Sequence, residues 1–101
     1  MKIELNTHLA DLDGKPIQNI ANETNGKVLA NALASSAEGD PVKFMSWAIL
    51  LHAGQPIEID KSDFETIRKF VESSRSLTNL AKAAIINAMI EQRDKQDAKK
   101  V

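Results

Sequence analysis

The sequence has no cysteine, no long hydrophobic run and almost no net charge. Without cysteine, disulfides, thiolate metal sites and a cysteine nucleophile are excluded. The longest apolar run, residues 47–51, is far shorter than the roughly 20 residues that span a bilayer. No positively charged start leads into an apolar segment, so we expect no signal peptide. These absences favour a soluble, intracellular domain.

The formal net charge of −1 excludes a strongly basic nucleic-acid-binding protein, although it leaves room for a local basic patch. The length of 101 residues, of which 43% are hydrophobic, is enough for one domain with a modest core. We therefore expect a single helical domain over residues 1–91, including an N-terminal extended arm. Residues 92–101 are rich in charge, and we expect them to form a frayed tail.

The N-terminal region has the pattern of a strand and a turn. Ile3 and Leu5 alternate with polar residues, which is the period of a half-buried strand. Asp13-Gly14 is a tight-turn signal, because both residues tolerate a positive φ. The pattern predicts a short β-hairpin or an extended arm. We also expect residues 15–18 to lie beside residues 55–59, since Gly-x-Pro-Ile occurs in both regions and isolated short strands need backbone partners.

From residue 24 onward the apolar spacing becomes helical and predicts about four helices, so the fold class is mainly α. Thr24 or Asn25 can cap the first helix, and Asp40, followed by Pro41, can cap the second. Asp60 can cap the third helix, with a competing capping box at Ser62, and the last helix begins near Ser76 or Thr78. The second helix is apolar almost all round, so we expect it to be the most buried element, with Trp47 inside the core.

Candidate catalytic and metal-binding residues are few. His52 falls in the last turn of the second helix, where an imidazole interacts favourably with the helix dipole, and no local triad surrounds it or His8. The segment Asp11-Leu12-Asp13-Gly14 resembles the start of a calcium loop, but the twelfth position is Asn22 instead of glutamate. We therefore expect no metal, no cofactor and no enzymatic activity.

The last helix carries two apolar lines. One line is expected to pack on the core and contains Leu77, Leu80, Ala81, Ala84 and Ala88. The other lies on roughly the opposite side and contains Ala83, Ile86 and Ile90, with Met89 beside it. Two apolar faces on one helix indicate either deep burial or a partner. We expect the second line to bind a partner, most simply in a homodimer, and the alternative is that the N-terminal arm packs over it within one chain.

Two short strings resemble a group of known proteins. They are Leu9-Ala10-Asp11-Leu12-Asp13-Gly14-Lys15-Pro16-Ile17 and Gly26-Lys27-Val28-Leu29-Ala30-Asn31-Ala32-Leu33, followed by Asp40-Pro41-Val42-Lys43. Their order resembles small, mostly uncharacterised proteins that tailed bacteriophages and prophages encode. The resemblance implies expression in the cytoplasm of a bacterial host. It implies no active-site residues.

The resulting functional prediction is a non-enzymatic phage-encoded interaction protein, either an assembly factor or a modulator of a host protein. The alternative is a nucleic-acid-associated regulator, because residues 61–101 carry 9 Lys/Arg against 6 Asp/Glu. The sequence leaves open which protein is the partner and whether the chain enters the virion.

Overall fold

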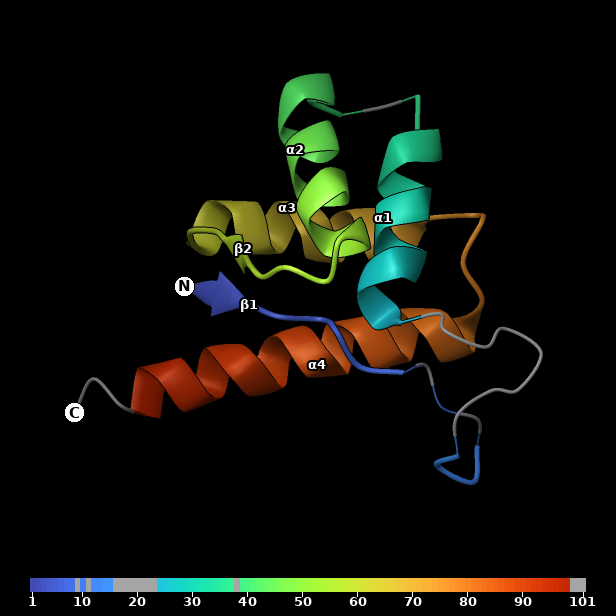
Figure 1. Ribbon diagram of the computed structural model, residues 1–101, viewed down its shortest axis with the longest axis vertical. Helices are drawn as coiled ribbons and strands as arrows, with labels where there is room; N and C mark the ends of the chain where they lie inside the picture. Colours follow the sequence, from blue (N-terminus) through green and yellow to red (C-terminus); the bar gives the residue numbers. More distant parts are fainter. Residues whose placement is uncertain (9, 11, 16–23, 38, 99–101) are drawn as a thin grey trace.

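The structure is a computed structural model that describes residues 1–8, 10, 12–15, 24–37 and 39–98. This part of the chain contains four helices and two short strands, which confirms the mainly α fold class. Two of the helices stand side by side above a long third one that crosses the base of the molecule, with the fourth behind (Figure 1). In chain order the elements are β1 (Lys2–Ile3), α1 (Asn25–Ser35), α2 (Pro41–His52), β2 (Ile57–Glu58), α3 (Lys61–Ser73) and α4 (Asn79–Ala98).

Each helix begins at a capping residue that the sequence indicated. The Thr24 hydroxyl accepts a hydrogen bond from the Lys27 amide, and the Asp40 carboxylate accepts from the amides of Val42 and Lys43. Asp60, and not the competing Ser62, caps α3 by accepting from the Asp63 amide at 2.7 Å. Thr78 accepts from the Ala81 amide at the start of α4. These bonds satisfy amides that have no partner within the helix, so local sequence fixes where the helices start.

The two strands come from distant parts of the sequence and pair with each other. Lys2 of β1 lies opposite Glu58 of β2, and Ile3 lies opposite Ile57, in antiparallel register. The predicted alternation is confirmed, since Ile3 and Leu5 are buried and the polar residues between them are exposed. Within the described residues β2 pairs with β1, and the predicted contact of residues 55–59 with residues 15–18 stays a prediction. Residues 16–18 lie outside the described residues, and Gly14 has the positive φ of 82° that the predicted turn requires.

Two glutamines of α4 bond to the edge of β1 that faces away from β2. The Gln96 amide group donates to the Lys2 carbonyl at 2.6 Å and accepts from the Lys2 amide at 2.8 Å. Gln92 makes the same two bonds with the backbone of Glu4. Because residues four apart lie on one side of a helix, their side chains reach alternate residues of the extended segment. The prediction of a frayed tail from residue 92 is therefore wrong for residues 92–98, which continue α4.

The core lies where α1, α2 and the sheet meet α3 and α4. Trp47 is 7% exposed, as predicted, and its ring lies 5.7 Å from that of Phe44, which in turn meets Phe70 edge-on at 5.3 Å. The largest fully buried side chains come from all six elements and the segments beside them: Ile3, Leu5, Leu29, Leu33, Leu51, Ile57, Ile67, Val71, Ile85 and Met89. Over the described residues, no helix combines the length and apolar character needed to cross a membrane.

Candidate functional site

The interface predicted on α4 is largely part of the domain's own core. Met89 is 1% exposed, and Ile86 and Ile90 are half-buried and pack against the core cluster. Only Ala83 of the four predicted partner-binding residues is exposed. Met89 is therefore wrong as a contact residue. The face of α4 that points inward is instead the line Ala81, Ile85 and Met89.

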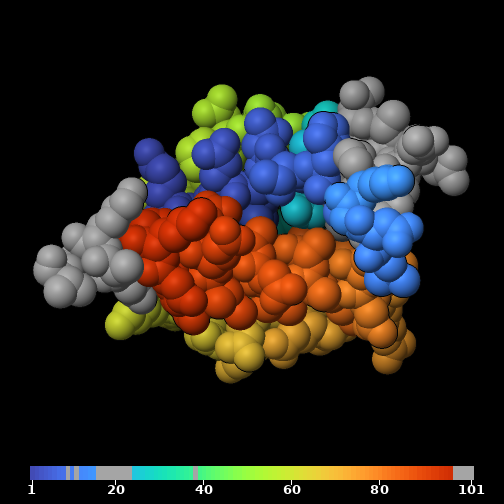
Figure 2. Space-filling model, turned by 90° about the horizontal axis from the view of Figure 1, so that it is seen from below, coloured from blue at the N-terminus to red at the C-terminus, as the bar shows by residue number. Residues whose placement is uncertain are grey.

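The physical reason is that α4 is covered from three directions. It packs against α1, α3 and β1, so much of its circumference is used within one chain. In the view from below, α4 lies between the N-terminal segment on one side and α3 on the other (Figure 2). The alternative that the N-terminal arm packs on α4 within the chain therefore agrees with the structure. Two apolar lines on this helix indicated burial.

The apolar surface that remains open is on α2. Of the five large hydrophobic residues that are exposed in the described part of the chain, four belong to this helix. They are Val42 at 75% exposure, Met45 at 43%, Ile49 at 64% and Leu50 at 41%. Positions 42, 45 and 49 follow the spacing i, i+3, i+7, so they form one stripe, and residue 50 extends it sideways. We call these four residues the α2 band.

The prediction that α2 is the most buried element is therefore wrong. One side of the helix holds Phe44, Trp47, Ala48 and Leu51 in the core, while the α2 band on the other side is exposed in the part of the chain that the structure describes. An all-round apolar helix is expected to be buried on every side. Helix α2 packs against α1 and β2, and it contacts α3 through Phe44 and Lys43. The other side is left facing solvent.

The α2 band borders a shallow groove between α1 and α2. Met45 and Ile49 form one wall, the alanines Ala30 and Ala34 come from α1, and the hollow has a volume of about 290 Å³. No Lys, Arg, Asp or Glu lines it among the described residues, and His52 stands at its end. Small side chains along α1 leave room for a neighbouring helix to approach closely. The groove is suited to an apolar side chain or helix face and has no polar set for a reaction.

The N-terminal end of α2 is fastened to α3 beside this band. The Lys43 ammonium donates to the Asp63 carboxylate at 2.9 Å. This hydrogen bond, with the attraction between the charges, lowers the pKa of the Asp63 carboxyl and raises the pKa of Lys43. Asp63 also lies in the first turn of α3, where a carboxylate is favoured by the helix dipole. The pair fixes the direction of α2 against α3 and keeps the cation next to the band neutralised.

The two histidines, which are far apart in the sequence, line one shallow hollow. His8 lies in a bridge with Thr24, and His52 lies in the last turn of α2, with Lys27 beside both. Within the described ranges no three His, Asp or Glu residues group in a way that could hold a metal ion. The first amides of α1 are also occupied: Asn25 donates to the Thr7 carbonyl, Gly26 to the Leu5 carbonyl, and Lys27 to Thr24. The helix N-terminus thus has no free amides there to bind an anion.

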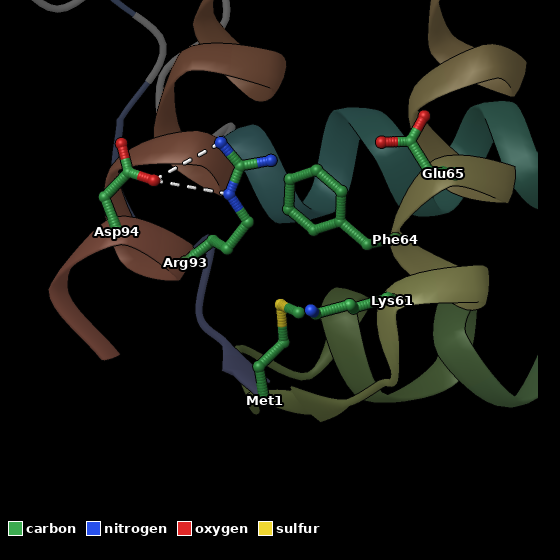
Figure 3. A pocket seen from close by; sticks show the side chains of 6 residues that line it. All are labelled: Met1, Lys61, Phe64, Glu65, Arg93 and Asp94. Carbon is green, nitrogen blue, oxygen red and sulfur yellow. Dashed lines mark hydrogen bonds and ion pairs between the residues drawn. The ribbon is translucent and has the colours of Figure 1, made fainter. Parts of the chain in front are cut away.

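A second hollow lies where Met1 meets α3 and α4 (Figure 3). The Arg93 guanidinium is placed over the Phe64 ring, 5.1 Å from its centroid, and also bonds to Asp94 at 3.3 Å. Phe64 is buried, and the Arg93 guanidinium covers its ring as a cation–π contact. Lys61 and Glu65 line the rim with opposite charges. This arrangement joins α4 to α3 and contains no pair of groups set for acid–base chemistry.

Comparison of the chain with protein-family models, curated proteins and solved structures gave no match.

Proposed function

We propose that the protein is a non-enzymatic interaction protein that binds another protein through the α2 band. The observation that carries this proposal is the exposure of four large apolar side chains on one face of a single helix. Contiguous apolar patches of this kind on small domains mark contact sites more often than chance exposure does. The groove along α1 extends the patch and gives a partner side chain a place to enter.

The chemistry around the band favours a protein partner over nucleic acid. Lys43 is the basic side chain closest in sequence to the band on α2, and its charge is paired with Asp63. Phosphate binding requires several unpaired Lys or Arg residues on one surface, and the groove presents none. A partner with an apolar helical face fits this surface better. The phage or prophage origin that the sequence strings suggest, and a place in the bacterial cytoplasm, belong to the same proposal.

Site-specific photo-cross-linking tests the proposal. A photoreactive phenylalanine analogue replaces Ile49 in the band or, as a control, Ala83 on the exposed side of α4. After irradiation in bacterial cells that express the chain, we expect covalent protein adducts from position 49 and none from position 83. The absence of adducts from position 49 would overturn the proposed function.

A further inference from the structure

We propose that the partner of the α2 band is a second copy of this chain, bound in a two-fold symmetric, antiparallel pair of α2 helices. This inference rests on the proposed function, because it names the occupant of the same surface. It places the dimer seam on α2 instead of α4. Three features of α2 support this pairing: the spacing of its residues, the apolar area of the band, and the polar groups at its two ends.

The spacing along α2 is self-complementary about Ser46. A two-fold axis that passes between two antiparallel α2 helices at the level of Ser46 sets Val42 of one copy opposite Leu50 of the other, since each lies four residues from the axis. Met45 and Ile49 lie one and three residues from the axis, so Met45 of one copy is offset by about 3 Å along the helix from Ile49 of the other. Ser46 is exposed and small, so the two helices can approach closely where the axis passes. Val42 and Leu50 therefore meet directly, and Met45 and Ile49 meet with a small offset.

The area that the band offers matches the apolar part of a typical interface. The exposed fractions of its four side chains correspond to about 400 Å² of apolar surface per chain. A standard interface buries about 800 Å² per partner, of which roughly 60% is apolar. Ala34 and Ala53 on the borders of the groove supply much of the remainder. The α2 band with these flanking alanines thus supplies most of the apolar area of a standard interface.

The charges at the ends of α2 agree with the antiparallel orientation. Asp40 caps the N-terminal end and His52 lies in the last turn, each six residues from Ser46. The two-fold axis sets Asp40 of one copy and His52 of the other at the same level along the seam, so each end of the seam holds one carboxylate and one imidazole. A parallel pair would instead set the two Asp40 carboxylates side by side, with mutual repulsion. Between these two ends Lys43 is the one charged residue of α2, and its ammonium is paired with Asp63.

Disulfide trapping tests this geometry directly, because the chain has no cysteine of its own. We expect Ser46→Cys to form a cross-linked dimer on mild oxidation, since the two copies of residue 46 face each other across the axis. Ala83→Cys, on the exposed side of α4, is the matched control and should remain uncross-linked at the same concentration. A cross-link from Ala83→Cys but not from Ser46→Cys would overturn the proposal in favour of a seam on α4.

Sedimentation equilibrium of the full chain completes the test. The wild type should be dimeric, and Ile49→Glu should weaken the dimer at least about 100-fold, because it puts a carboxylate into the apolar seam of both copies. Ala83→Glu, with the same change of charge, should leave the dimer intact, and circular dichroism checks that both variants are folded. A wild type that remains monomeric at millimolar concentration would overturn the inference. If position 49 then still cross-links to a different protein in cells, the proposed function stands and only the identity of the partner is wrong.

Discussion

The two faces of α2 should respond in opposite ways to substitution. Trp47 and Ile49 are two residues apart on one helix, but Trp47 is 7% exposed in the core and Ile49 is 64% exposed in the α2 band. We predict that Trp47→Ala strongly destabilises the fold and that Ile49→Glu hardly changes it. Since both changes lie in the same helix, differences in helix position or length cannot account for the contrast.

The magnitudes follow from burial. Removing a buried tryptophan costs about 3–5 kcal/mol, and this includes the loss of the ring contact with Phe44 at 5.7 Å. That cost is a large share of the roughly 5–15 kcal/mol by which a domain of this size is stable. Ile49 has about a third of its surface buried, so its loss costs at most about 1 kcal/mol, and glutamate regains a few tenths as a better helix former.

Urea denaturation followed by far-ultraviolet circular dichroism measures both free energies of unfolding. Fluorescence is unsuitable, because Trp47 is the only tryptophan in the sequence. The measurements should be made at about 1 µM chain, since any dimer adds an apparent stability that depends on concentration. The placement of α2 would be refuted if Ile49→Glu cost more than about 2 kcal/mol under these conditions. It would equally be refuted if Trp47→Ala cost less than 1 kcal/mol.

The helix boundaries could be predicted from the sequence because capping is a local interaction. Thr24, Asp40 and Asp60 each accept a hydrogen bond from an amide two or three residues later, and no distant contact is needed. The alternation of Ile3 and Leu5 likewise required only the period of a strand. Such signals fixed the element order and the fold class.

The pairing of the strands could not be predicted in the same way. The partner of β1 comes from the segment between α2 and α3, and two-residue strands carry too few side chains to specify register from pattern alone. The C-terminal end of α4 could not be predicted for a similar reason. Gln92 and Gln96 look like ordinary polar residues of a charged end until β1 lies beside them, because their bonds are to backbone groups.

The sequence pattern alone could not tell which of two helices keeps an open apolar face. Two apolar faces indicate burial or a partner, and the sequence shows this feature in both α2 and α4. The choice between the outcomes depends on how many neighbours each helix has. Helix α4 crosses the base of the molecule and is covered from three directions, so its second face became part of the core. Helix α2 lies at one side, and its second face remained open.

Three further predictions concern the parts of the fold that hold these helices in place. Thr24→Ala should cost about 0.5–2 kcal/mol of unfolding free energy, with Thr24→Ser close to the wild type, because only the capping hydroxyl is needed. Asp63→Asn should be less stable than the wild type near neutral pH, and this difference in unfolding free energy should vanish in acid. The contact with Lys43 lowers the pKa of the carboxyl in the folded state. The carboxylate therefore stabilises the fold above its unfolded pKa of about 3.9, and this stabilisation is lost as the pH falls through the folded value. Replacing both Gln92 and Gln96 with alanine removes four hydrogen bonds from the outer edge of β1, which water can partly replace, so we expect a loss of roughly 1–2 kcal/mol. The more sensitive readout is hydrogen exchange of the two amides that these glutamines accept from, which should speed up while the amides of α1 keep their protection. An uncovered strand edge also recruits other chains, so the same variant should aggregate faster than a Glu91→Ala control on the same helix. Unchanged exchange at both amides would show that the glutamines do not protect this edge in solution.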